Sequence, residues 1–314
     1  MEYIILIVSL IGIVFSADLL VGGAVSIARK YKVSDFVIGA AIVGVGTSMP
    51  EFVVSFLGAL NGNADVAIGN VVGSNIFNVL GILGITAIFF PIAVDRKNMR
   101  FELPLCIFVS VLLLLLTFNC FNGSASSLAR LDGILLLLVF ALYMLYSFAR
   151  DRKEAAVAAD NGDGGSLWKA VLKVVGGLAL LITSCDFFVD NAVSVAKSFG
   201  VDNAFISLTL IACGTSLPEL AASVAAAVKK NTDMALGNIV GSNIFNITLI
   251  LGLSSQVMPL TSSGITYIDY IVMIAATVLL FVIGLFGRIG RLSGLLMFIC
   301  FVLYNWYLVS NQMA

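Results

Sequence analysis

Long apolar segments, separated by short polar breaks, alternate along nearly the whole chain. A helix that crosses a bilayer needs about 20 mostly apolar residues. Ten segments meet this requirement, at 3–28, 36–60, 65–90, 101–119, 128–149, 167–197, 203–228, 233–258, 267–287 and 290–311. The first is too long for a signal peptide and lacks a basic start and a small-residue cleavage site, so we expect it to remain as a helix. The pattern therefore predicts an all-α membrane protein with ten transmembrane helices.

Composition supports a membrane protein and excludes several kinds of chemistry. The 314 residues are 60% hydrophobic and 11% charged, with a mean hydropathy of +1.09, whereas a soluble domain is about one quarter charged. A net charge of −1 provides no overall basic field for nucleic acid. Because there is no histidine, serine–histidine and cysteine–histidine catalysis and histidine-bound zinc are excluded. The five cysteines lie in apolar runs without a CxxC pair, and we expect free thiols.

Lysine and arginine residues indicate how the helices are oriented, because cytoplasmic loops of membrane proteins are enriched in both. If the N-terminus is outside, 15 of the 17 basic residues fall in cytoplasmic loops. They are Arg29, Lys30, Lys32, Arg96, Lys97, Arg100, Arg150, Arg152, Lys153, Lys169, Lys173, Lys229, Lys230, Arg288 and Arg291. We therefore predict a multi-pass protein of the cell (inner) membrane, with both termini outside and a cytoplasmic linker at 151–166.

A shift of 168 residues aligns the sequence with itself. Between Gly46–Gly84 and Gly214–Gly252, 22 of 39 positions are identical. Each copy contains five predicted helices, an odd number, so the second copy starts from the opposite side of the membrane. The sequence therefore predicts two inverted five-helix repeats, at 1–150 and 167–314. Inverted repeats of this kind place a substrate site near the bilayer midplane, between the copies, and suit alternating access.

Two acidic residues, Glu51 and Glu219, lie deep within the second and seventh predicted helices. An acidic side chain at this depth costs about 3 kcal/mol on insertion scales, so it should face a cavity or a partner. Each follows a proline, Pro50 or Pro218, which has no N–H to donate and breaks the helix. We expect each break to leave carbonyl oxygens free at a buried or hydrated site. Hydroxyl groups in the same turns come from Thr47, Ser48, Thr215 and Ser216.

The helix after each glutamate supplies further polar groups at matching positions. Ser74 and Asn78 are four residues apart and share one helix face, and Ser242 and Asn246 repeat this arrangement. Carboxylate, hydroxyl, amide and carbonyl oxygens are hard ligands that suit sodium or calcium, whereas zinc and copper prefer sulfur or imidazole. We therefore predict a site for transported sodium and calcium ions, with no resident cofactor.

Four segments carry a family resemblance: Gly46–Glu51 with Gly73–Asn78, and Gly214–Glu219 with Gly241–Asn246. They resemble the two alpha-repeats of the cation/calcium exchanger superfamily, and most closely its prokaryotic sodium/calcium exchanger branch. The resemblance covers all ten predicted helices. It implies an antiporter, not an enzyme, that exchanges sodium for calcium, in which the first and sixth helices form a moving gate against an eight-helix core.

The resemblance also implies which oxygen atoms bind the ions. Matched residue by residue, the side-chain ligands are Thr47, Ser48, Glu51, Ser74, Thr215, Ser216, Glu219 and Ser242. The backbone carbonyls of Gly44 and Ala212 join them, and we add Asn78 and Asn246 as candidates. Archaeal relatives pair one asparagine with an aspartate at the last two positions. With asparagine at both, the site has two formal negative charges, and the exchange stoichiometry stays open.

Alternatives to a sodium/calcium antiporter remain at this point. A calcium/proton antiporter, with Glu51 or Glu219 carrying the proton, is the main one, although the Gly-Thr-Ser start of each motif favours sodium. An intramembrane hydrolase and a channel are the others. The expected partners are sodium and calcium ions and the lipid bilayer, with no nucleic acid and no obligate protein partner. The sequence leaves open the roles of Asp18, Asp186, Asp190, Asn75 and Asn243.

Overall fold

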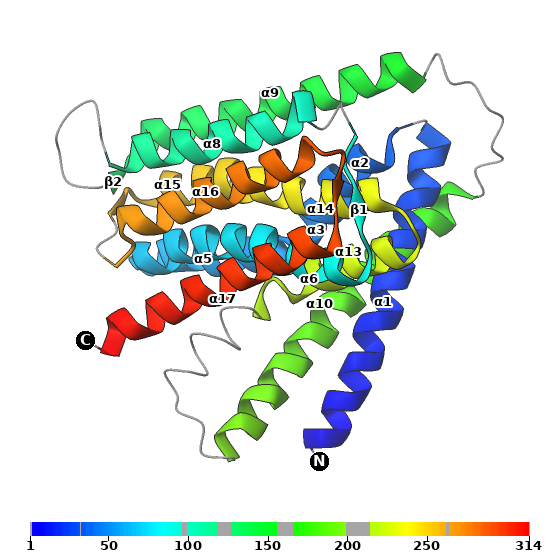
Figure 1. Cartoon of the computed structure of the whole chain (residues 1–314), viewed down its shortest axis with the longest axis horizontal. Coiled ribbons are helices and arrows are strands. Elements are labelled where there is room, and N and C mark those ends of the chain that lie inside the picture. Colours follow the sequence, from blue (N-terminus) through cyan, green and yellow to red (C-terminus); the bar gives the residue numbers. More distant parts are fainter. Residues whose placement is uncertain are drawn as a thin grey trace.

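The computed structural model describes residues 2–31, 33–95, 99–118, 127–155, 166–198, 214–261 and 264–313. Helices make up nearly all of this part of the chain (Figure 1). In the first half they are α1 (Glu2–Tyr31), α2 (Asp35–Ile38), η1 (Gly39–Gly44), α3 (Val45–Thr47), α4 (Met49–Leu60), α5 (Ala64–Ile76), η2 (Phe77–Leu83), α6 (Gly84–Phe89), α8 (Glu102–Thr117) and α9 (Arg130–Ala155). In the second half they are α10 (Leu167–Ser198), α13 (Leu217–Val228), α14 (Thr232–Phe245), η4 (Asn246–Ile250), α15 (Leu251–Val257), α16 (Tyr267–Gly284) and α17 (Arg291–Met313). The predicted helical class is confirmed.

The lengths and composition of these helices make the chain a membrane protein. Among the described residues, seven helices are long and apolar enough to cross a bilayer, or eight if one bent pair counts as a single span. Two shorter apolar helices, Glu102–Thr117 and Leu217–Val228, fall within the predicted segments 101–119 and 203–228. Part of the second of these segments, 203–213, lies outside the described residues.

The predicted break of the second helix is confirmed. The segments Asp35–Thr47 and Met49–Leu60 are bent by 49° at Ser48. The cause is Pro50, which lies in the first turn of α4, where a missing N–H costs least. Helix α13 starts in the same way, with Pro218 in its first turn after Ser216. Both glutamates therefore lie at the N-terminal end of a helix, where the backbone dipoles stabilise negative charge.

Within the described residues, three π-helical segments, η1, η2 and η4, interrupt the regular helices. Hydrophobic periodicity did not predict them, because one wide turn changes the angular positions of the apolar side chains too little to be recognised in the sequence pattern. Segments of this kind are frequent at functional sites. Here η2 and η4 contain Asn78 and Asn246, and η1 contains the Gly44 carbonyl.

The part of the chain that the structure describes also contains four two-residue strands, which the sequence pattern did not predict and which join the connections between helices. Strand β1 (Ile92–Ala93) pairs antiparallel with β4 (Arg288–Ile289), and β2 (Ser127–Leu128) pairs antiparallel with β3 (Leu260–Thr261). β1 follows α6 and its partner precedes α17, whereas β3 follows α15 and its partner precedes α9. The same pairing therefore occurs twice with the two halves of the chain exchanged.

In both halves of the chain, the central helices are more buried than the first helix. In the apolar 18-residue stretches of Ala64–Phe89 and Thr232–Val257, 83% and 94% of the residues are buried, whereas the share is 28% in those of Glu2–Tyr31 and Leu167–Val195. Figure 1 shows α5 and α14 in the middle of the molecule, with α1 and α10 together at one side. The candidate site residues on α5, η2, α14 and η4 are thus held in the packed centre, next to a less buried helix pair.

Helices α1 and α10 approach closely at Gly177. A Cβ atom there would lie 2.8 Å from the Leu20 nitrogen and 3.1 Å from the Ser16 carbonyl oxygen. The neighbouring Gly176 has nothing within 4 Å. We expect Gly177→Ala to destabilise the protein by about 1–3 kcal/mol, because the added methyl group meets backbone that cannot rotate away.

Gly176→Ala is the matched control. It adds the same methyl group in open space and should leave stability unchanged or raise it by up to about 1 kcal/mol, since alanine favours helix over glycine. Thermal unfolding of both variants in detergent measures the difference. Equal melting temperatures would contradict the close packing of α1 on α10.

Candidate functional site

Glu51 and Glu219 form the centre of the site. Both side chains are completely buried. Ser216 Oγ donates a hydrogen bond of 2.8 Å to Glu51 Oε1, and Ser48 Oγ donates one of 2.8 Å to Glu219 Oε1. Each glutamate therefore accepts a hydrogen bond from the serine that precedes the other glutamate in the sequence. Such a reciprocal exchange is the signature of two copies related by a two-fold axis.

The second oxygen of each glutamate has no hydrogen-bond partner among the described residues. Several buried side-chain oxygens share this property, and five of them belong to residues that the sequence predicted as ion ligands: Glu51 Oε2, Glu219 Oε2, Asn78 Oδ1, Asn246 Oδ1 and Thr215 Oγ1. Buried polar atoms are nearly always bonded, so oxygens without a partner need an explanation. These five are hard oxygen ligands of the kind that calcium and sodium prefer.

Asn75 and Asn243, whose roles the sequence left open, tie the two copies together. The side-chain nitrogen of each donates to the backbone carbonyl of the other, at 3.2 Å in both directions. Asn78 Nδ2 donates to Asn243 Oδ1 and Asn246 Nδ2 to Asn75 Oδ1, each at 3.0 Å. Because the amide nitrogens of Asn78 and Asn246 are used in this clamp, their oxygens are left for another partner.

The remaining predicted ligands that the structure describes lie around Glu51 and Glu219. Ser74 Oγ is 3.2 Å from Ser216 Oγ, and Thr47 Oγ1 is 3.3 Å from Asn238 Oδ1. Ser242 Oγ donates to the Gly44 carbonyl at 3.2 Å. Ala212 lies outside the described residues.

The Gly44 carbonyl, which the resemblance implies as an ion ligand, accepts hydrogen bonds within the protein. It accepts a backbone hydrogen bond of 3.0 Å from Ser48, in addition to one from the Ser242 hydroxyl. The π-helical segment η1 brings this carbonyl against α14, where a hydroxyl reaches it. In this arrangement the Gly44 oxygen is bonded within the protein.

Two residues that sequence reasoning did not single out, Asn70 and Asn238, hold the glutamate-bearing turns in place. Asn70 Nδ2 donates to the Glu51 carbonyl at 3.1 Å and to Ser55 Oγ at 2.9 Å. Asn238 Nδ2 makes the equivalent bonds to the Glu219 carbonyl and Ser223, at 3.2 and 2.9 Å. A signal was present, because both asparagines and both serines are identical between the copies.

A cavity of about 550 Å³ reaches the site between α4, α10 and the start of α13. Its lining includes Pro50, Thr215, Pro218, Cys185, Asp186 and Asp190. Two acidic side chains whose roles were open therefore line a path that ends at the prolines next to Glu51 and Glu219. An acidic, partly open cavity of this kind favours the approach of cations.

The site has few charges for its size. Within the described part of the chain, no group of three or more histidine, cysteine, aspartate or glutamate residues is placed to hold a metal ion. The centre thus combines two carboxylates with neutral oxygens. This is a suitable arrangement for ions that must leave again, since fewer ligand charges bind calcium more weakly.

Comparison with known proteins places the chain in a family. The profile of the sodium/calcium exchanger protein family matches residues 1–149 and 169–310. The chain belongs to this family. It is 39% identical over 314 residues to the putative antiporter CaxA of Alkalimonas amylolytica, covering 98% of both chains. It is 30% identical over 319 residues to the sodium/calcium exchanger MaX1 of Methanosarcina acetivorans, covering 90% of both.

A solved structure of a sodium-calcium exchanger has the same fold. The structure of NCX_Mj, soaked with zero Na+ and Ca2+, superposes with a TM-score of 0.84 at 29% sequence identity, covering 98% of both chains. The family resemblance predicted from the paired motifs is therefore confirmed. The relatives are exchangers, which agrees with the expectation of a transporter rather than an enzyme.

The hydrogen bonds of Asn70 and Asn238 to the glutamate-bearing turns predict unequal effects on stability when each asparagine is replaced by leucine. Asn238 has an additional contact, because its Oδ1 lies 3.3 Å from the Thr47 hydroxyl. We expect Asn238→Leu to cost about 1–3 kcal/mol for each buried group it leaves without a partner. Asn70→Leu should cost less, since Asn70 is only partly buried and no equivalent contact with Thr215 is present. Thermal unfolding of the two variants tests this order, and a larger effect at Asn70 would contradict the described network.

Proposed function

We propose that the chain exchanges sodium for calcium across the membrane by alternating access, with the ions bound between Glu51 and Glu219. The observation that carries the proposal is that five buried oxygens of the predicted ligands have no partner among the described residues. They come from both copies and include the two carboxylates, and one of their residues, Thr215, lines the acidic cavity. Membership of the sodium/calcium exchanger family supports the choice of ions.

The proposed ligand set uses the reciprocal geometry of the centre. It comprises side-chain oxygens of Glu51, Glu219, Thr47, Ser48, Ser74, Asn78, Thr215, Ser216, Ser242 and Asn246, and the carbonyl oxygens of Gly44 and Ala212. The carboxylates carry two formal negative charges, which one calcium ion balances. Sodium ions neutralise the same carboxylates one by one and thereby compete with calcium. Serine hydroxyls that now donate to the carboxylates can rotate to offer their lone pairs to an ion.

The proposed architecture is ten transmembrane helices in two inverted repeats, at 1–150 and 167–314, joined by the cytoplasmic linker 151–166. Three reciprocal arrangements support it: the serine–glutamate bonds, the asparagine clamp and the paired short strands. In this arrangement both termini lie on the outer side of the cell membrane. The helices α1 and α10, which are much less buried than the central helices, act as the gate that moves across the packed centre.

Purified protein in liposomes tests the proposal. An outward-directed sodium gradient should drive uptake of radioactive calcium, and Glu219→Gln should reduce that uptake to the level of protein-free vesicles, because the site loses half of its charge. Glu102→Gln is the matched control, since Glu102 is also a buried glutamate but lies at the start of α8, away from the site. It should retain transport. Uptake that survives Glu219→Gln would contradict the proposed site.

The coupling ion is tested separately. In sodium-free vesicles, an imposed pH gradient should drive no calcium uptake, and collapsing that gradient should leave sodium-driven uptake unchanged. These results are expected because the hydroxyl-rich centre offers sodium neutral oxygen ligands beside each carboxylate. Calcium uptake that follows the pH gradient and ignores sodium would establish the calcium/proton alternative instead.

A further inference from the structure

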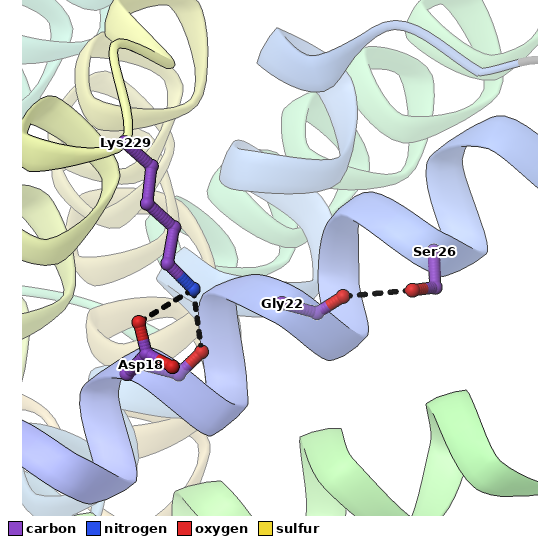
Figure 2. A network of polar contacts seen from close by, with 4 residues as sticks. All are labelled: Asp18, Gly22, Ser26 and Lys229. Carbon is purple, nitrogen blue, oxygen red and sulfur yellow. Dashed lines mark hydrogen bonds and ion pairs between the residues drawn. The ribbon is translucent and has the colours of Figure 1, made fainter.

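An ion pair joins the gate helix α1 to the end of α13. Lys229, which caps the C-terminus of α13, places its Nζ 2.7 Å from Asp18 Oδ1 and 2.9 Å from the Asp18 backbone oxygen. Figure 2 shows the lysine reaching across to both atoms of the same residue. Asp18 lies within a helix long and apolar enough to span the membrane, where an unpaired charge is costly. The contact therefore joins two elements that the transport cycle is expected to separate.

The repeat does not reproduce this contact on the other side. At the shift of 168 residues Asp18 corresponds to Asp186, but Lys229 corresponds to Asn61. Gly22, one turn after Asp18, corresponds to Asp190. A Cβ at Gly22 would lie 3.6 Å from the Lys229 Nζ, an ordinary contact distance, so position 22 is next to the lysine. The charge pair thus departs from the reciprocal arrangement of the centre.

The two sides also differ in how tightly they are packed. Val189 and Thr215 line the cavity beside Asp186 and are partly exposed. Their counterparts at the shift of 168 are Val21 and Thr47, which are both 0% exposed. The side with the cavity is the side without the lysine. The side with the lysine is closed.

We propose that Lys229 is a one-sided latch, which holds α1 against α13 and favours the state in which the path along α10 is open. The inference rests on the proposed alternating access. Opening the path along α1 requires the Lys229–Asp18 pair to break, whereas opening the path along α10 breaks no equivalent pair with Asn61. The latch therefore biases an exchanger whose two halves are otherwise built alike.

The expected strength of the latch is modest. The side chains of Lys229 and Asp18 are 33% and 64% exposed, and partly exposed pairs shift an equilibrium by up to about five-fold. This magnitude suits a latch, because a much stronger pair would trap the carrier in one state. We expect removal of the pair to change the ratio of the two states by about two- to five-fold.

Thiol modification of the purified protein measures this ratio without any transported ion. In a background without the five native cysteines, Val189→Cys reports the cavity along α10, because Val189 lines it. In the same background, Val21→Cys places the reporter at the equivalent position along α1. With Lys229→Asn, which installs the residue of the other copy, the V21C thiol should react about two- to five-fold faster with a small polar thiol reagent. The V189C thiol should react more slowly.

Matched variants keep the test decisive. Lys230→Asn removes the same charge from the adjacent position, where a φ of 59° is readily adopted by asparagine, and should leave both rates unchanged. Asp18→Asn breaks the pair from the α1 side and should reproduce the effect of Lys229→Asn. Unchanged rates in both pair-breaking variants would overturn the latch, as would equal effects of Lys229→Asn and Lys230→Asn. Because the readout uses no sodium or calcium, loss of the proposed ion coupling alone would leave the expected labelling result unaltered.

Discussion

Two carboxylates buried within membrane-spanning helices are the constraint on which the rest of the structure depends. Burying an ionised group without partners is far too costly to be tolerated. The fold meets part of the cost by placing Glu51 and Glu219 in the first turns of helices and by giving each a serine hydroxyl from the opposite copy. Among the described residues, the second oxygen of each carboxylate has no partner. In the proposed function, the cost that remains favours the binding of cations.

The centre and the gate are built by different means. Hydrogen bonds between asparagines, together with close-packed apolar side chains, fix α5 and α14 against each other at the middle of the molecule. Such buried polar contacts are worth most where they are fully bonded. Helices α1 and α10 instead pack mainly on each other and meet the centre through fewer contacts, among them one ion pair. A rigid site beside a loosely attached helix pair allows access to change while the ligand geometry is kept.

Sequence patterns predicted much of this arrangement and missed parts of it for physical reasons. The internal repeat and the Pro-Glu pairs located the centre, because helix breaks and buried acids are costly enough to stand out from an apolar background. The asparagines Asn70 and Asn238 were missed, because a sequence does not distinguish an asparagine that bonds a backbone turn from one that binds an ion. The π-helical turns left no mark in the periodicity. The Lys229–Asp18 pair joins residues 211 positions apart, and neither residue has a sequence neighbour that indicates a partner.

In the proposed function, one set of oxygens around Glu51 and Glu219 binds calcium and sodium in turn. Equilibrium binding of radioactive calcium to the purified protein, titrated with sodium chloride at constant ionic strength, tests whether the two ions share this site. We expect sodium to displace calcium competitively, with a steeper than hyperbolic dependence, because more than one sodium ion is needed to neutralise two carboxylates. Potassium at the same concentration should displace little. Calcium binding that is unaffected by sodium would contradict a shared site.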